Sequence, residues 1–168
     1  MKFKLLLFCA LNLTAFAGPL QDAINAAEPG DILRLNDGLY EGNIIVDKPL
    51  TIIGKDGGAV IRGNRKSSVI KVTAKNVKLI NLNIEGSGTS QMELDAGVSC
   101  LKGNNLLVEK SRFKDVLFGI ELSECNQAVI RDNNITSKEG FDVPRRGDAV
   151  RAWYSHENLI ERNYVYNS

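Results

Sequence analysis

Four side chains in this sequence could coordinate a metal ion that prefers soft ligands. A thioether, two thiols and an imidazole are available, from Met92, Cys100, Cys125 and His156. Such donors are the ligands that copper handling would require. The four residues are far apart in the sequence, without a C-x-x-C motif, an H-x-H motif or a methionine cluster. They are candidate metal ligands, but their spacing alone does not assemble a site.

The carboxylates that could catalyse acid–base chemistry are scattered along the chain. Hydrolysis of a glycosidic bond needs two carboxyl groups at a set separation. The sequence has no adjacent pair of aspartates and no Gly-His-Gly motif. Acidic residues of the second half are spread as on a solvated surface, among them Asp95, Asp115, Glu121, Glu124, Asp132, Asp142 and Asp148. No catalytic residue is assigned, and the chain is predicted not to be an enzyme.

Four aromatic residues near the C-terminus could contact a sugar or a partner protein. Trp153 and Tyr154 are adjacent, and Tyr164 and Tyr166 lie one expected strand further on. Successive side chains of a strand point to opposite faces, which is expected to send one residue of each pair outward. An exposed ring can stack on a sugar or anchor a protein. Packing over the side of the core is the alternative role.

The segments that carry these residues repeat one another. Aligning "FGIELSECNQAVIRDNNI" with "DAVRAWYSHENLIERNYV" places four pairs at equal offsets: Ile120 with Val150, Ile130 with Ile160, Asn133 with Asn163 and Ile135 with Val165. Two further units start at Val69 and Val98, so that successive starts are 29, 22 and 30 residues apart. A period near 22 with insertions of variable length is typical of a solenoid.

The residue types within each unit indicate which solenoid forms. Short runs alternate β-branched or other apolar residues with polar ones, as in 98–100 and 120–122, and no unit holds an apolar stripe long enough for a helix. Asn and Gly, which suit bends, separate the runs. The sequence therefore predicts an all-β fold, a right-handed parallel β-helix with three short strands per turn. Asn at a constant offset is expected to hydrogen-bond the next turn.

A short helix is expected to cover the first turn. Leu20, Ala23, Ile24 and Ala27 form an apolar stripe at helical spacing, and Pro29-Gly30 ends it. Residues 18–30 are thus predicted to be an N-terminal capping helix, and residues 31–168 the β-helix turns. The first strands are expected at 32–35, 44–46 and 50–53, with bends at 37–38, 47–49 and 56–58.

The first 17 residues have the pattern of a secretory signal peptide. Lys2 and Lys4 precede an apolar run, and Ala15-Phe16-Ala17 forms an A-x-A cleavage site. Removal of this segment leaves 19 basic and 20 acidic residues. A balanced charge excludes the basic excess that nucleic-acid binding requires. We expect a soluble protein exported to the periplasm.

Cys100 and Cys125 would both be present after export to an oxidising compartment. Cys100 aligns with Leu122, an inward core position, whereas Cys125 aligns with Gly103 in the following bend. The two are displaced along the turn as well as stacked, so a disulfide is not expected.

The sequence stops at Asn167-Ser168, in the middle of an expected turn. A solenoid that stops there exposes an unpaired strand and its core. The expectation is that this chain is the truncated N-terminal part of a longer β-helix protein.

Two segments together resemble the NosD family. "AINAAEPGDILRLNDGLYEGNIIVDKPLTIIG" is similar to the opening of many exported pectin-lyase-like β-helix proteins, and "RRGDAVRAWYSHENLIERNYV" adds the pattern Arg-x-Gly-x-x-Val-x-x-Trp. The resemblance covers about 20–168. It implies a periplasmic accessory protein that supports copper-centre maturation of nitrous oxide reductase. The implied partners are the membrane subunits of an ABC transporter and a copper chaperone or the reductase.

The same resemblance implies a carbohydrate-binding and sugar-hydrolysis repeat domain, but a shared fold does not fix function. A protein that binds or cleaves a polysaccharide is therefore the alternative, and a product without its own function is a third possibility. No cofactor is assigned to this chain, and copper belongs to the full-length family context. The sequence does not identify metal ligands, a sugar or a partner surface.

Overall fold

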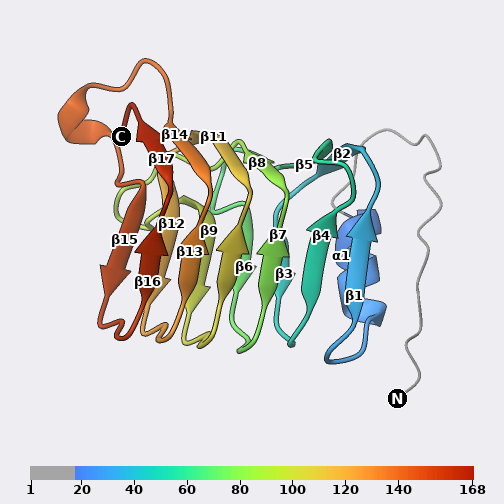
Figure 1. Ribbon diagram of the computed structural model, residues 1–168. Helices are drawn as coiled ribbons and strands as arrows, with labels where there is room; N and C mark the ends of the chain where they lie inside the picture. The colour runs from blue at the N-terminus through green and yellow to red at the C-terminus, as the bar shows by residue number, and fades with distance from the viewer. Residues whose placement is uncertain (1–17) are drawn as a thin grey trace.

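A computed structural model describes residues 18–168, in which three parallel sheets wind into a β-helix (Figure 1). The predicted signal peptide lies outside the described residues. The first sheet, here called sheet A, consists of β1 (Ile32–Leu35), β4 (Thr51–Gly54), β7 (Lys78–Ile80), β10 (Leu107–Glu109), β13 (Val129–Arg131) and β16 (Leu159–Glu161). Sheet B consists of β2 (Gly38–Glu41), β5 (Ala59–Arg62), β8 (Asn83–Glu85), β11 (Arg112–Val116), β14 (Asn134–Ser137) and β17 (Tyr164–Tyr166). Sheet C consists of β3 (Ile44–Val46), β6 (Ile70–Val72), β9 (Ala96–Leu101), β12 (Phe118–Ser123) and β15 (Val150–Trp153).

The core lies inside the coil because alternate residues of each strand point inward. On sheet A the inward row is Leu33, Ile52, Leu79, Val108 and Ile130, each buried. The inward row of sheet B contains Ile61, Ile84, Phe113 and Ile135. Burying each large aliphatic side chain contributes about 1.5–3 kcal/mol relative to exposure, so the stacked rows are the main stabilising feature of the coil.

The predicted alignment of the repeats is confirmed at most positions and wrong at one. Ile120 pairs with Val150, Ile130 with Ile160, and Ile135 with Val165. Val98, however, pairs with Ile70 and not with Val69. The stretch from Val72 to Lys78 is one residue shorter than the stretch between their partners, Cys100 to Leu107, so the offset changes at that corner.

Asparagine side chains bond successive turns at the corners, as predicted. Asn133 Nδ2 donates to the Val108 carbonyl oxygen at 3.0 Å and to Asn163 Oδ1 at 2.9 Å, and Asn133 Oδ1 accepts from the Ser111 N–H at 3.0 Å. Residues with positive φ recur at the same corner, although Lys110 and Arg162 occupy this position as well as Asn81. The corner therefore imposes its backbone conformation on residues that rarely adopt it.

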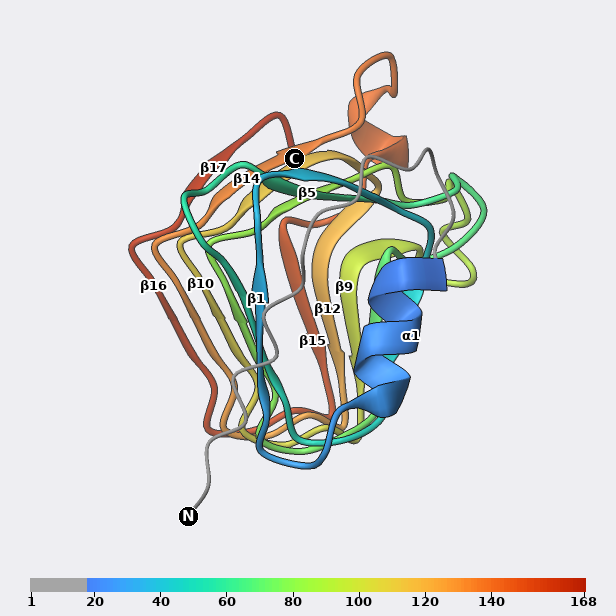
Figure 2. The ribbon, with the colours of Figure 1, turned by 90° about the vertical axis from the view of Figure 1, so that its right-hand side faces the viewer.

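The predicted N-terminal cap is confirmed as α1 (Gly18–Ala26), which lies at the end of the coil (Figure 2). Leu20 and Ile24 are its buried residues and belong to the core. The side chain of Gln21 accepts from the Ile45 N–H at 2.8 Å and donates to the Ile45 carbonyl at 3.2 Å. Lys48 Nζ donates to the carbonyls of Asn25 and Ala27 near the helix C-terminus. The helix thus covers the core and satisfies backbone groups at the edge of β3.

The coil is less covered at its other end. The inward residues Ile160 and Val165 are 49% and 45% exposed, because within residues 18–168 no further strand pairs with β16 or β17. Between β14 and β15 the chain makes a loop with a short 3-10 helix (Val143–Arg145). Phe141 of this loop packs against a small cluster of Ala96, Leu117 and Phe118 outside the main core. No helix among the described residues is long and apolar enough to cross a membrane.

The prediction that Cys100 and Cys125 do not pair is wrong, because they form a disulfide. Their Cα atoms are 6.3 Å apart, which is within the range that a disulfide requires. Both side chains are buried. Cys125 is level with Gly103, three residues after Cys100, but the bend after β9 turns the chain back and keeps the two cysteines close. The predicted level of Cys125 is correct, because the Gly103 N–H donates to Cys125 Sγ at 3.2 Å.

Candidate functional site

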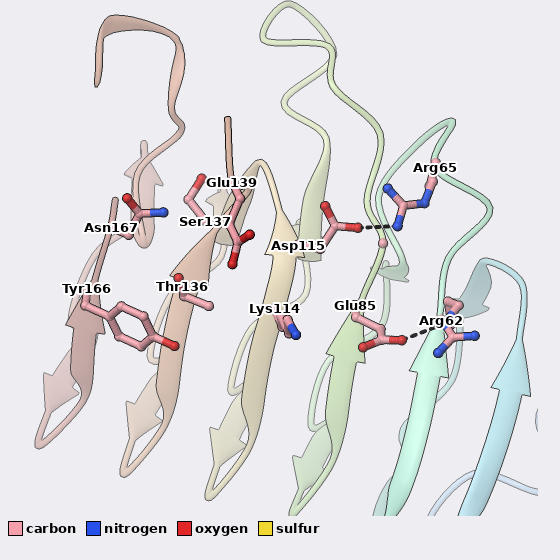
Figure 3. A pocket seen from close by; sticks show the side chains of 11 residues that line it. Arg62, Arg65, Glu85, Lys114, Asp115, Thr136, Ser137, Glu139, Tyr166 and Asn167 are labelled. Atoms are coloured by element: carbon pink, nitrogen blue, oxygen red, sulfur yellow. Dashed lines mark hydrogen bonds and ion pairs between the residues drawn. The ribbon is translucent and has the colours of Figure 1, made fainter. Parts of the chain in front are cut away.

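A groove of about 1060 Å³ lies across the outer face of sheet B, near the C-terminal ends of its strands (Figure 3). Its wall is formed by residues from five successive strands and from the segments that follow them: Arg62, Arg65, Glu85, Gly86, Lys114, Asp115, Thr136, Ser137, Glu139, Tyr166 and Asn167. The groove crosses the strands, so it runs along the axis of the coil.

The register of sheet B creates a column of outward side chains in this groove. Arg62 pairs with Glu85, Glu85 with Lys114, and Thr136 with Tyr166. Each residue directly follows an inward core residue in the sequence, so alternation turns it outward. The order along the groove is Arg62, Glu85, Lys114, Thr136 and Tyr166 (Figure 3).

Ion pairs fix most of the charged groups in the column and leave one free. Arg62 pairs with Glu85 through its Nε and lies 3.9 Å from a Glu41 carboxylate oxygen. Lys114 is exposed and forms no ion pair with any described residue. Its ammonium group is therefore the cation of this column that is available to a ligand.

Asp115, which also lines the groove, lies at a β-bulge. The pairing of β11 with β14 shifts between Phe113 and Val116, and Asp115 adopts a φ of 54°. Lys138 Nζ, whose side chain is only 4% exposed, donates to the Asp115 carbonyl and to Oδ1, each at 3.0 Å. Arg65 donates to Oδ2 at 2.8 Å. Bulges change the direction of side chains at the edge of a site, and here two cations hold that direction.

The four predicted aromatic contacts are all exposed, but they lie on two sheets. Trp153 ends β15 of sheet C and makes an edge-on contact with Tyr154, with 5.1 Å between ring centroids. Tyr164 and Tyr166 both point outward on sheet B, with ring centroids 5.5 Å apart. The expectation that alternation would send only one of this second pair outward is wrong, because residues two apart share a face. Tyr166 belongs to the groove.

The four candidate metal ligands do not form one site. Cys100 and Cys125 are joined in a disulfide, which leaves no thiolate to bind a metal. Met92 is 90% exposed in the loop before β9, and His156 lies in the turn between β15 and β16. In residues 18–168 no three residues drawn from His, Cys, Asp and Glu are grouped as a metal centre. This donor set does not fit a copper ion, and no copper-binding step is assigned to it.

Two carboxylates outside the groove are held by specific partners. Asp132 accepts from Arg162 Nε at 2.8 Å and from a second guanidinium nitrogen at 3.1 Å, and these hydrogen bonds lower the pKa of Asp132. Glu121 is 3% exposed on sheet C, and its carboxylate accepts from the hydroxyls of Ser99 and Ser123. The sequence placed Glu121 on a solvated surface, whereas the structure buries it.

Among the charged residues of the groove, only Asp115 was considered from the sequence, and it was assigned to a solvated surface. Arg62, Glu85 and Lys114 each look like an ordinary exposed residue within their own repeat unit. The signal that could have identified them is their constant place, one residue after the inward residue of the sheet B strand. Comparing the residues at that position in all repeat units would have predicted the column of side chains, but not the groove in which they lie.

Comparison with known proteins adds one relative by sequence. Over 153 residues, 90% of this chain, the sequence is 25% identical to a protein of Pseudomonas aeruginosa described as probable ABC transporter binding protein NosD. The chain is thus similar in sequence to NosD. The chain spans 36% of the length of that NosD protein. No model of a protein family matches the chain.

Solved structures that resemble the chain share its fold. An alginate lyase from Paenibacillus matches 89% of this chain and 64% of its own length, with a TM-score of 0.66 and 15% identity. A protein described as a putative glycosyl hydrolase, from Parabacteroides merdae, matches 87% of this chain and 86% of its own, with a TM-score of 0.60 and 15% identity. A pectin methylesterase in complex with a hexasaccharide matches 69% and 44%, with a TM-score of 0.55 and 17% identity. At this level of identity the likeness shows a pectin-lyase-like β-helix fold alone.

Proposed function

We propose that this chain is a non-enzymatic, NosD-like accessory protein of the periplasm. In this proposal it works with an ABC transporter to support copper-centre maturation of nitrous oxide reductase. The observation that carries the proposal is the resemblance to NosD along 90% of the chain. That relative is described as a probable ABC transporter binding protein, which supports the choice of partner.

Two features of the structure suit the docking role in this proposal. The stacked core and the disulfide make a coil that presents its outer faces in a fixed order. Trp153 and Tyr154 are 56% and 70% exposed at the end of sheet C, and aromatic side chains of this kind are enriched at protein interfaces. We assign the contact with the transporter to these two rings, and copper enters the proposal only as cargo of the wider system.

Photo-crosslinking in cells of the native host tests the partner. A photoreactive phenylalanine analogue at Tyr154 is expected to give a crosslink to a membrane subunit of the ABC transporter. The same analogue at Lys78, an exposed residue of sheet A, is the matched control and is expected to give none. The proposed partnership is wrong if the protein is present in the periplasm and the analogue crosslinks to no transporter subunit from Tyr154 or from Trp153.

A further inference from the structure

The N-terminal end of the coil is covered by its helix on one side (Figure 2). Helix α1 lies over sheet C, where the Gln21 side chain bonds both backbone groups of Ile45 on the edge strand β3. The edge strands of the other two sheets, β1 and β2, are each paired on a single side within residues 18–168. A row of unpaired backbone N–H and C=O groups is a template for a further strand.

The hydrogen bonds of β1 show which of its backbone groups are open. The carbonyl oxygens of Asp31 and Leu35 accept from the N–H groups of Thr51 and Lys55 in the next turn, at 3.0 and 2.9 Å. In a parallel pair the bonds recur at every second residue of a strand. Arg34 lies at the intervening position, so its N–H and C=O point to the opposite side, where no described strand pairs with β1.

A pocket of about 380 Å³ lies between α1 and this open edge, and most of its lining residues are apolar: Pro19, Leu20, Asp22, Ala23, Ala26, Leu33, Arg34, Leu35 and Tyr40. Leu33, Arg34 and Leu35 are consecutive, and consecutive side chains of a strand point to opposite faces. One pocket contacts all three because it reaches the unpaired edge of the strand. An apolar cavity of about 150 Å³ holds a benzene ring, so this pocket has room for two apolar side chains.

The pocket exists because the side of α1 that faces β1 carries small side chains. Pro19, Ala23 and Ala26 are three or four residues apart, which places them on one side of the helix. Tyr40 of β2 forms the far wall, and its hydroxyl donates to the Asn36 carbonyl oxygen at 3.0 Å. An apolar side chain that enters from the open edge therefore meets a wall that is already formed.

Two charged residues of the pocket have no ion pair among the described residues. Asp22 on α1 and Arg34 on β1 are both exposed. Further along sheet A, the column that contains Arg34 pairs charges between turns, because Arg131 Nε donates to Glu109 Oε2 on the preceding strand at 2.8 Å. A strand added at β1 can place an acidic side chain beside Arg34 in the same arrangement.

Other occupants satisfy this end of the coil less well. A lipid chain or a small apolar molecule fills the pocket but leaves the open N–H and C=O groups of β1 without partners. A second copy that paired through β1 would bring two Arg34 side chains together on one short strand, and like charges so close are destabilising. An extended peptide satisfies the backbone of the edge, the apolar pocket and the arginine at once.

We propose that β1 accepts an extended peptide of another protein as a further strand of sheet A, with the pattern apolar–acidic–apolar. The peptide backbone bonds the open groups of Arg34, and its two apolar side chains enter the pocket beside Leu33 and Leu35. Its acidic side chain pairs with the Arg34 guanidinium, and Asp22 favours a basic residue further along the peptide. The proposal does not depend on the accessory role proposed above, which concerns the rings at the far end of sheet C.

Fluorescence anisotropy with a labelled eight-residue peptide that contains Val-Glu-Val-Lys tests the proposal on the exported protein. The peptide is expected to bind saturably. Ala26→Phe fills the pocket and is expected to weaken binding on the order of tenfold, which corresponds to about 1.4 kcal/mol. Asn25→Phe, an exposed position of α1 that does not line the pocket, is the matched control and should bind as the original chain does. Circular dichroism checks that every variant is folded.

A charge exchange tests the register of the added strand. Arg34→Glu is expected to weaken the Val-Glu-Val peptide about threefold and to strengthen a Val-Lys-Val peptide by a similar factor, as for a cross-strand ion pair. Lys78→Glu, at an exposed position two strands away on sheet A, is the control and should change neither affinity. Methylation of the peptide's central backbone nitrogens should abolish binding, because it removes the donors of the ladder.

Four results would overturn the proposal. These are no binding of the Val-Glu-Val peptide, equal binding by Ala26→Phe and Asn25→Phe, equal binding of the methylated peptide, and no exchange of preference in Arg34→Glu. Equal binding of the methylated peptide would assign the pocket to an apolar ligand without strand addition. A dimer of the exported protein that Ala26→Phe dissociates would assign the edge to a second copy, and it would also overturn the proposal.

Discussion

Replacement of Asn133 by alanine is expected to destabilise the coil strongly, although the residue lies at a corner and not in an apolar row. Its side chain is 2% exposed and bonds three other residues. The amide accepts from the Ser111 N–H and donates to the Val108 carbonyl and to the Asn163 side chain. These partners belong to the turns before and after Asn133, so one substitution weakens the link between three turns.

The magnitude follows from the number of bonds and from their burial. Each hydrogen bond contributes a net ~0.5–1.5 kcal/mol, and a buried group left without a partner costs ~1–3 kcal/mol. The loss of three bonds, with the Ser111 N–H left unpaired, is expected to lower the free energy of unfolding by about 3 kcal/mol. For a chain of this size that corresponds to a decrease in Tm of roughly 6–12 °C.

Urea unfolding followed by circular dichroism and by tryptophan fluorescence measures this effect. Trp153 is the only tryptophan of the chain and lies in β15, so fluorescence reports on the end of the coil while circular dichroism reports on all turns. The matched control is Asn134→Ala. The Asn134 side chain forms no hydrogen bond with a described residue, and its loss should change stability by less than about 0.5 kcal/mol. Equal effects of the two substitutions would refute the role given to the asparagine corner.

Three further outcomes are expected from the structure. Protein purified without reductant should show Cys100 and Cys125 linked by peptide mass mapping, and replacing both by alanine should lower stability by about 3 kcal/mol for a loop of 25 residues; free thiols in the folded protein would contradict the pairing. Phe113→Ala should lower the free energy of unfolding in urea by about 3–5 kcal/mol, because the ring is 1% exposed in the core. A loss of less than about 1.5 kcal/mol, the upper end for Ile→Val, would contradict this tight packing. The pKa of Asp132, measured by NMR titration, should lie below its ordinary value, so its contribution to stability is lost as pH falls through that lowered pKa; Arg162→Gln should raise the pKa toward the ordinary value, and no change would exclude the ion pair as the cause.

The repeat of the sequence was sufficient to predict the coil, because stacked positions demand similar residues. The first strands at 32–35 and 44–46 have the same bounds in the structure. β2 and β5 were not predicted, because each directly follows a glycine-containing bend and has only one or two residues of clear strand type. The pairing of Val98 with Ile70 was missed because a corner one residue shorter leaves no mark in an apolar segment.

The candidate site was harder to predict than the fold. Whether Cys100 and Cys125 meet depends on how sharply the chain bends after β9, and a linear alignment does not contain that curvature. The groove is lined at one outward position of five sheet B strands, and these residues come together only when the strands stack. Tyr166 was selected from the sequence for its aromatic ring. Lys114 stands out only in the structure, where Glu85 forms its ion pair with Arg62 and leaves the Lys114 ammonium group without one among the described residues. The copper and transporter roles remain proposals that rest on resemblance.

The copper content of nitrous oxide reductase in the native host tests the central functional claim most directly. Deletion of the gene for this chain is expected to leave the reductase polypeptide in the periplasm with most of its copper missing, and a plasmid copy of the gene should restore it. Copper would be measured by mass spectrometry on the purified reductase, with a strain that lacks an unrelated periplasmic β-helix protein as control. A reductase with its full copper content in the deletion strain would contradict the proposed function.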